Sequence, residues 1–245
     1  MDTPEPAKRI MMVTGESSGD LHGANLIKAV NALPSGNIRF FGAGGQKMAE
    51  AGCEILIPGE DLAVMGVFEV FGQLPVIWRS FQKLKKELFG PQKPDALVLI
   101  DFPEFNLRLA KQAQKAGVPV LYYVSPQVWA WRRGRVKKIA RVVDKLAAIL
   151  PFEPAFYNGL DIDVKYVGHP LIDEIHTPLG RDEFLEELGV DKEKRIVGLF
   201  PGSRRSEIDY MFDTLLETGH KIMQSEPDTH FLVPLASTLK REELQ

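Results

Sequence analysis

The alternation of short apolar runs with helical runs is the feature that most limits how this chain can fold. Runs with the length and composition of buried strands occupy residues 9–14, 38–44, 53–58, 94–101, 118–126, 145–152 and 163–170. Stretches with helical spacing follow several of them, at residues 20–33, 107–117 and 133–143. Strands that alternate with helices of this length predict an α/β fold with a doubly wound parallel sheet.

Loops that follow these strands carry the candidate ligand-binding sequence, at residues 15–20, 42–45, 101–106 and 125–131. In an open parallel sheet, ligands bind beyond the carboxyl ends of the strands. All carboxyl ends of such a sheet lie at one edge. We therefore expect the four loops to share one rim.

The pattern breaks after the sequence GHPL and restarts near residue 195. The charged residues 172–194 are expected to be largely helical, and a new strand, turn and helix start are predicted over residues 195–208. We place a boundary near residues 173–190, between a first domain at 1–175 and a second unit at 176–245. The second unit is too small to form a doubly wound domain by itself.

The net charge, the cysteine count and the lengths of the apolar runs exclude several classes of protein. The formal net charge of −3 over 245 residues gives no general attraction to nucleic acid. The single cysteine, Cys53, excludes an internal disulfide framework and suits a reducing compartment. The start of the chain lacks the apolar region of a signal peptide, and no run reaches the roughly 18 apolar residues of a spanning helix. We expect a soluble or peripheral protein.

The first loop, with the sequence GESSGD from Gly15 to Asp20, matches neither a P-loop nor a dinucleotide fingerprint. Its acids, Glu16 and Asp20, would repel phosphate but accept hydrogen bonds from sugar hydroxyls, and Ser17 and Ser18 could donate or accept. The alternative is a capped turn in which Asp20 is the N-cap of the following helix. The glycine-rich residues 42–45 leave the same two interpretations open.

The third loop places two carboxylates after a buried strand, at Asp101 and Glu104. Pro103 holds the bend rigid. A partly desolvated carboxylate at this position could act as a general base. The alternative is turn capping with a surface ion pair, and spacing alone does not establish a paired acid/base mechanism.

The fourth loop leads into a dense basic segment. Trp129 and Trp131 flank Ala130, and six of the ten residues from Arg132 to Arg141 are Lys or Arg. Such a segment could bind single-stranded nucleic acid through stacking and phosphate contacts. It could also bind a phosphorylated lipid or an anionic membrane, or form a solvated helix face with two packed tryptophans.

The apolar residues Val64–Arg79 precede three lysines, Lys83, Lys85 and Lys86. This combination suits contact with a bilayer or with acyl chains, and equally a core element between two strands. Gly66, Gly72 and Pro75 argue against a long regular helix here.

Near the end of the chain, Gly202, Ser203 and Arg204 follow a strand and precede a helix that begins near Ser206. Helix N-terminal amides beside an arginine suit a pyrophosphate, and an ordinary capped turn is the alternative. The histidines have no metal-ligand spacing, so His22 and His169 are taken as lone residues and no metal site is expected.

Taken together, these motifs resemble the lipid-A-disaccharide synthase family. The sequences GESSGDLHGANL, FGAGGQKM, LIDFPEFN, YYVSPQVWAWRRGRVKKI, LPFEPAFY, YVGHPL and LFPGSRRSEI occur in the family's order between about Arg9 and Ser237. The resemblance implies a GT-B glycosyltransferase: a Rossmann-like doubly wound parallel sheet, with a second Rossmann-like domain that is truncated at its C-terminus here.

The activity implied by the resemblance is inverting transfer from UDP-2,3-diacylglucosamine to 2,3-diacylglucosamine 1-phosphate, which gives lipid A disaccharide 1-phosphate and UDP in lipopolysaccharide biosynthesis. No cofactor or metal is implied. The implied partners are these two acylated sugars and the membrane surface, with no nucleic acid and with a possible homodimer. The implied location is cytoplasmic and peripheral, at the inner face of the inner membrane.

The resemblance also assigns roles to residues. Glu104 or Asp101 is the implied catalytic base; the family usually has Asp at the position of Glu104, which leaves the choice between the two open. Implied UDP contacts are Gly202, Ser203 and Arg204, and implied membrane or acyl contacts are Val67, Phe68, Phe71 and Trp78. The implied acceptor contacts are Gly15, Glu16, Ser17, Ser18, Asp20, Ser125, Gln127, Trp129, Trp131 and Arg132.

Family chains continue well past residue 245. An intact acceptor half and an incomplete donor half are therefore expected, with little or no activity from this chain alone. Two other hypotheses stay open from the residues: a different UDP-sugar enzyme on the same fold, and a non-catalytic module that binds an anionic lipid or nucleic acid through Arg132–Arg141.

Overall fold

The computed structural model describes residues 7–34, 37–62, 69–129, 134–175, 177–203, 205–236 and 239. The chain divides into two compact units, Met1–Glu174 and Ile175–Gln245, and each is described by itself.

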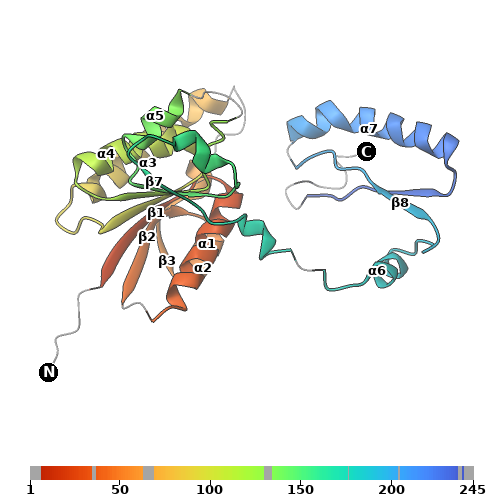
Figure 1. Cartoon of the computed structure of the whole chain (residues 1–245), viewed down its shortest axis with the longest axis horizontal. Helices are drawn as coiled ribbons and strands as arrows, with labels where there is room; N and C mark the ends of the chain where they lie inside the picture. The colour runs from red at the N-terminus through yellow and green to blue at the C-terminus, as the bar shows by residue number, and fades with distance from the viewer. Residues whose placement is uncertain are drawn as a thin grey trace. The chain divides into compact units, whose positions relative to one another are not determined.

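A parallel sheet forms the centre of the first unit (Figure 1). Its strands lie in the order β3-β2-β1-β4-β5-β6-β7, with β1 and β4 in the middle. Every neighbouring pair is parallel, which confirms the predicted doubly wound sheet. The strands are β1 Lys8–Val13, β2 Ile38–Gly44, β3 Cys53–Pro58, β4 Ala96–Ile100, β5 Val120–Tyr123, β6 Lys145–Ala148 and β7 Asp163–Tyr166.

Helices cover both faces of this sheet. On one face, α1 (Ser17–Asn31) and α2 (Gln46–Glu50) pack on a cluster that includes Met12, and on the other a larger cluster includes Met11. Neighbouring residues of a strand point to opposite faces, so β1 contributes to both cores. The elements on the Met11 side are α3 Glu69–Leu88, α4 Pro103–Lys115, α5 Arg135–Ala140 and the 3-10 helix η2 Glu153–Tyr157. Two further 3-10 helices, η1 Gly59–Asp61 and η3 Pro170–Ile172, lie in connections.

The prediction that no long helix forms around residues 64–79 is wrong. Helix α3 runs without a break from Glu69 to Leu88 and contains Pro75. A proline inside a helix costs about 3 kcal/mol because it removes one hydrogen bond and crowds the preceding turn. Helix α3 offsets that cost by burying Leu84 and Leu88 completely in the core. Tertiary packing therefore overrides the local preference.

The first helix also begins earlier than predicted. Helix α1 starts at Ser17 with Glu16 at the N-cap, so Asp20 lies within its first turn and is not its cap. The sequence GESSGD is thus a short turn followed at once by helix.

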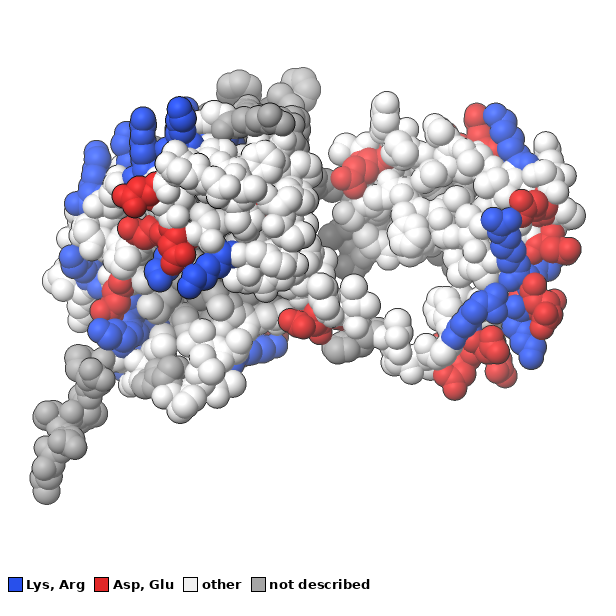
Figure 2. All heavy atoms as spheres, viewed as in Figure 1, with Lys and Arg blue, Asp and Glu red and all other residues white. Residues whose placement is uncertain are grey.

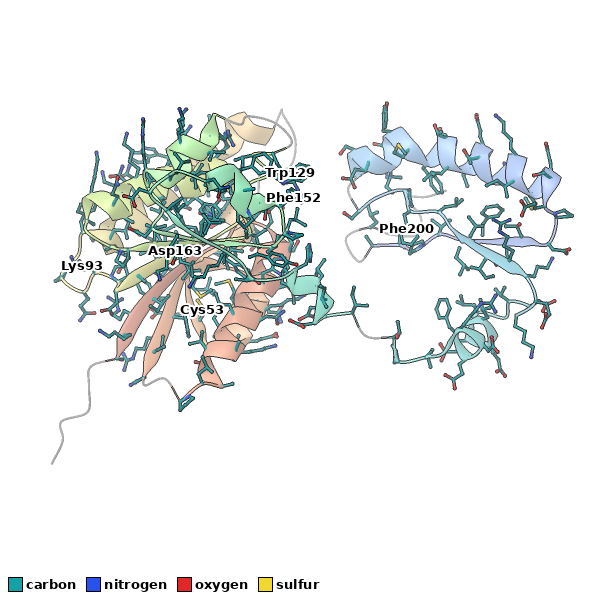
Figure 3. The ribbon with its side chains drawn as sticks, in the orientation of Figure 1. Cys53, Lys93, Trp129, Phe152, Asp163 and Phe200 are labelled. Atoms are coloured by element: carbon teal, nitrogen blue, oxygen red, sulfur yellow. The ribbon has the colours of Figure 1, made fainter. Side chains whose placement is uncertain are left out.

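The second unit contains a parallel pair of strands, β8 (Arg195–Gly198) and β9 (Thr229–Leu232). Helix α7 (Arg205–Ser225) connects them, which confirms the strand, turn and helix predicted over residues 195–208. The preceding residues are less helical than expected: η3 and the seven-residue α6 (Arg181–Glu187) are the helical elements described between residues 170 and 194. The side chain of Phe200, which follows β8 in the second unit, is 75% exposed (Figure 3).

Candidate functional site

The carboxyl ends of β1, β4 and β5 form a shared rim, because these three strands are neighbours and parallel. The loops after them are in contact. A Cβ atom placed on Gly15 would lie 2.9 Å from the ring of Phe102, so the turn after β1 approaches the turn after β4 too closely for a side chain. The sheet therefore brings the GESSGD turn beside the DFPEF turn, as the sequence predicted.

The turn after β4 has an unusual backbone. Asp101 and Phe102 have positive φ values of 46° and 49°, and Val124, in the turn after β5, has a φ of 63°. Left-handed conformations of non-glycine residues cost about 1–3 kcal/mol each and occur mainly at functional sites, where the surrounding structure enforces them. The strain identifies this part of the rim as the candidate site.

Asn106 holds the strained turn in place. It is completely buried, and its Nδ2 donates to the carbonyl oxygens of Asp101 at 2.8 Å, Ile100 at 3.2 Å and Val13 at 3.4 Å. The hydroxyl of Tyr122 donates to the same Asp101 carbonyl. Burial, followed by the nearby charge of Asp101, raises the pKa of Tyr122 well above its ordinary value, so this donor stays protonated.

The two candidate bases differ in their surroundings. Glu104 lies in the first turn of α4, and its side chain is 66% exposed. It forms an ion pair with Arg135 of α5, whose own side chain is only 20% exposed. Asp101 is half-buried in the strained turn itself. Helix α5, part of the basic segment Arg132–Arg141, is thus joined through Arg135 to Glu104, one of the two candidate bases.

Asp20 serves a neighbouring helix. It is 8% exposed, and its carboxylate accepts hydrogen bonds from the backbone N–H groups of Gly45 (2.8 Å), Lys47 (3.0 Å) and Met48 (3.1 Å) at the start of α2. It therefore caps α2 from α1 and couples two of the predicted loops. Glu16, Ser17 and Ser18 are exposed at the rim, where they remain candidates for contact with a sugar.

The turn after β5 packs on η2. Ser125 is buried, with its Oγ 3.4 Å from the hydroxyl of Tyr157. The ring of Trp129 packs edge-on against Phe152 with centroids 5.3 Å apart (Figure 3). Gln127 is exposed. Trp131 and Arg132 lie outside the described residues.

Beneath this turn, Glu153 is 2% exposed and accepts the backbone N–H groups of Ile149 and Leu150, each at 3.0 Å. Burial raises the pKa of Glu153, and these two donors act in the opposite direction.

Several Lys and Arg side chains project from the edge of the first unit that carries α4 and α5 (Figure 2).

His22 and His169 are not lone residues, contrary to the sequence interpretation. His169 lines a pocket of about 370 Å³ between α1 and the residues after β7. The ring of His22 lies 6.2 Å from that of Tyr123, which lines the same pocket. Burial and the neighbouring His169 lower the pKa of His22, against a smaller opposing effect of Glu174. Among the described residues, no group of His, Cys, Asp and Glu side chains has the arrangement of a metal site.

The candidate pyrophosphate turn already contains an anion. The backbone N–H of Ser203 donates to the Glu207 carboxylate at 2.9 Å, and Gly202 has a φ of 113°. An incoming pyrophosphate would have to displace Glu207 from this amide. Arg204 lies outside the described residues.

The candidate membrane contacts are described only in part. Trp78 of α3 is 63% exposed, and Leu74 one turn earlier is 50% exposed. Val67 and Phe68 lie outside the described residues, as does the side chain of Phe71. Within the described ranges, no helix combines the length and the apolar character needed to cross a bilayer.

Comparison with known proteins supports the resemblance. The family model for lipid-A-disaccharide synthetase matches residues 10–245. The lipid-A-disaccharide synthase of Syntrophotalea carbinolica is 63% identical over 97% of this chain, and that of Trichlorobacter lovleyi is 52% identical over 97%. The chain spans 60% and 61% of the length of these two curated relatives.

Solved structures show the same fold at low identity. The S. aureus MnaA structure with UDP superposes with a TM-score of 0.65 at 12% identity, covering 97% of this chain and 65% of the other. The architecture is therefore that of the GT-B glycosyltransferases and related epimerases. From its family model and its curated relatives, the chain belongs to the lipid-A-disaccharide synthetase family.

Proposed function

We propose that the protein to which this chain belongs transfers a 2,3-diacylglucosamine unit from UDP to the 6-hydroxyl of 2,3-diacylglucosamine 1-phosphate, with inversion at the anomeric carbon. Family membership gives the reaction class. The observation that carries the assignment of the site is the strained turn at Asp101 and Phe102, locked by Asn106 at the rim of the sheet.

In this mechanism a carboxylate of the turn removes the proton of the acceptor's 6-hydroxyl as that oxygen attacks the anomeric carbon. The bond from this carbon to the UDP oxygen breaks, and UDP leaves with the electron pair. We assign the base to Glu104 or Asp101, and the ion pair with Arg135 orients Glu104. The backbone of the turn is held by hydrogen bonds from Asn106 and Tyr122 to the Asp101 carbonyl, which favours a preorganised site.

The other candidate site residues are assigned to binding of either the acceptor or the UDP-sugar. Gly15, Glu16, Ser17 and Ser18 on one side, with Ser125, Gln127 and Trp129 on the other, are proposed to surround the acceptor sugar. Gly202, Ser203 and Arg204, which precede α7 in the sequence, are proposed to hold the departing diphosphate, whose charge suits helix N-terminal amides. Asp20 is proposed to act indirectly, by fixing α2 against the turn.

We further propose that the first unit binds the acceptor and that the second contributes to the UDP-sugar site. The exposed Leu74 and Trp78 are proposed to touch the membrane that holds the acyl chains. We propose a peripheral position on the cytoplasmic face of the inner membrane, as the family resemblance implies. A homodimer is compatible with this assignment.

A chimera tests the proposal, because the chain covers 60% of its relative's length. Residues 1–245 would replace the matching part of the Syntrophotalea carbinolica enzyme, and disaccharide would be followed by thin-layer chromatography with labelled acceptor. We expect product from the chimera. In the same background, Glu104→Gln or Asp101→Asn should lower kcat about 10²–10⁴-fold, the usual contribution of a general base.

Glu54→Gln, at an exposed position of β3, is the matched control and should retain full activity. If an active chimera keeps its rate with both carboxylates replaced, the assignment of the base to this turn is wrong. An inactive but folded chimera that fails to bind the acylated acceptor would refute the proposed reaction for this chain.

A further inference from the structure

A small pocket lies at the end of β3, on the side of the sheet covered by α3. Its volume is about 220 Å³, and it opens between Leu56 and Asp61 on one side and Val76, Arg79, Ser80 and Lys83 on the other. Pockets for whole drug-sized ligands measure about 300–1,000 Å³. This one has room for a headgroup fragment.

Two cationic side chains of α3, those of Arg79 and Lys83, line the pocket. Arg79 and Lys83 are one helical turn apart, so their side chains lie on the same stripe of α3. The Lys83 ammonium donates to the carbonyl of Leu56 at 2.8 Å, which fixes it at the pocket and leaves two N–H groups to point elsewhere. Among the described residues, no carboxylate forms an ion pair with either cation, although Asp61 also lines the pocket.

The polar lining suits a phosphomonoester. An arginine can grip two phosphate oxygens at once, and a lysine adds a compact positive charge. Ser80, which is only 7% exposed, also lines the pocket and can offer its hydroxyl to a ligand. Asp61 can accept a hydrogen bond from a sugar hydroxyl next to the phosphate. Arg79, Lys83 and Ser80 are called the phosphate wall below.

The same helix presents three different surfaces. Leu84 and Leu88 are buried in the core, the phosphate wall faces the pocket, and Leu74 and Trp78 are exposed. Trp78 directly precedes Arg79. Tryptophan favours the boundary between apolar and aqueous phases, so α3 can hold a charged group in the pocket while the attached apolar chains remain in a neighbouring lipid phase.

Helix α3 is also linked to the candidate base. Phe81, between the phosphate wall and the core, packs edge-on against Phe105 with ring centroids 5.6 Å apart. Phe105 follows Glu104 directly in α4. The helix that lines the pocket is therefore in direct contact with the helix that carries Glu104, one of the two candidate bases.

We propose that the phosphate wall is the subsite for the 1-phosphate of the acylated sugar acceptor. The inference rests on the proposed function, since it names the part of the protein that would recognise the acceptor's charge. It predicts that this chain distinguishes a lipid sugar phosphate from the same lipid sugar without phosphate.

The test measures binding of the full chain to 2,3-diacylglucosamine 1-phosphate and to its dephosphorylated analogue, both in mixed detergent micelles at fixed salt. We expect the parent chain to bind the phosphorylated lipid at least tenfold more tightly. The double variant Arg79→Gln, Lys83→Gln should lose this preference and bind the dephosphorylated lipid as the parent does. The control Lys111→Gln, Lys115→Gln removes the same charge from exposed positions of α4 outside the pocket and should keep the preference.

Each outcome separates the two proposals. Equal affinity of the parent for both lipids, or a preference that survives in the double variant, overturns the subsite while leaving the proposed function standing. No binding of either lipid by the parent counts against the proposed function itself. Phosphatidic acid offers a phosphomonoester on a phospholipid; if it competes as well as the sugar phosphate, the wall binds membrane headgroups and the assignment to the acceptor is wrong.

Discussion

Removal of the Asn106 amide should destabilise the first unit by an amount that the structure allows us to estimate. Leucine has nearly the shape of asparagine, so Asn106→Leu removes the donor without opening a cavity. Three carbonyl oxygens, those of Val13, Ile100 and Asp101, then lose contact with Nδ2. Each lost hydrogen bond costs about 0.5–1.5 kcal/mol net, and more where the acceptor stays buried without a partner.

Two effects limit the loss. The Asp101 carbonyl keeps the hydroxyl of Tyr122 as a donor. The turn can also relax, which releases part of the strain of about 1–3 kcal/mol stored at each left-handed residue. We therefore expect Asn106→Leu to lower the free energy of unfolding by about 2–4 kcal/mol. With a typical urea m value, this lowers the unfolding midpoint by roughly 1–2 M.

Tryptophan fluorescence during urea unfolding is the appropriate assay, because all three tryptophans, at 78, 129 and 131, belong to the first unit. Asn158→Leu, at an exposed position, is the control and should unfold like the parent. Asn106→Asp should cost more than Asn106→Leu, since a buried carboxylate would face three carbonyl oxygens. An Asn106→Leu midpoint within experimental error of the parent would refute the claim that this side chain enforces the turn.

Two further predictions concern residues near the rim. Asp20→Ala should lower the free energy of unfolding by about 2 kcal/mol and speed hydrogen exchange of the amides at Gly45, Lys47 and Met48, because three backbone donors lose their acceptor. Asp20→Asn, which retains one carbonyl oxygen, should lose less, and unchanged exchange in Asp20→Ala would contradict the capping role. The pKa of His22 is lowered in the folded state, so the unfolded chain binds the proton more readily and stability falls as the pH drops below the ordinary value of 6.5. The loss of stability between pH 7.5 and 5.5, measured by the same urea assay, should therefore be smaller for His22→Gln than for the parent, and equal losses would show that His22 does not contribute to the pH dependence.

The sequence was sufficient for the sheet and its rim because both depend on local pattern. Alternating strands and helices specify a parallel sheet, and a parallel sheet puts the loops after β1, β2, β4 and β5 at one edge. Those loops were predicted from residues that are adjacent in the chain. No long-range contact had to be known.

What the sequence did not predict depends on contacts between distant residues. Asp20 looked like the cap of its own helix because its true partners lie 25–28 residues later. Pro75 was expected to interrupt a helix, but packing of Leu84 and Leu88 in the core stabilises α3 across it. Asn106 is a polar residue on the otherwise apolar buried face of α4. This contrast was the only sign in the sequence that its amide holds the turn after β4. His22 and His169 come together only through the return of the chain after β7.

The central position of β1 has a consequence for synthesis of the protein. Ile10 on this strand pairs with Ala96 on β4, 86 residues later in the chain. At about 5–20 residues per second, the ribosome needs roughly 4–17 s to make that partner. During this time β1 can pair with β2 only, and one edge of a strand that carries Met11, Met12 and Val13 is unpaired. The nascent chain therefore exposes an unpaired strand edge, flanked by apolar side chains, while it is being made, which is the kind of surface that chaperones bind.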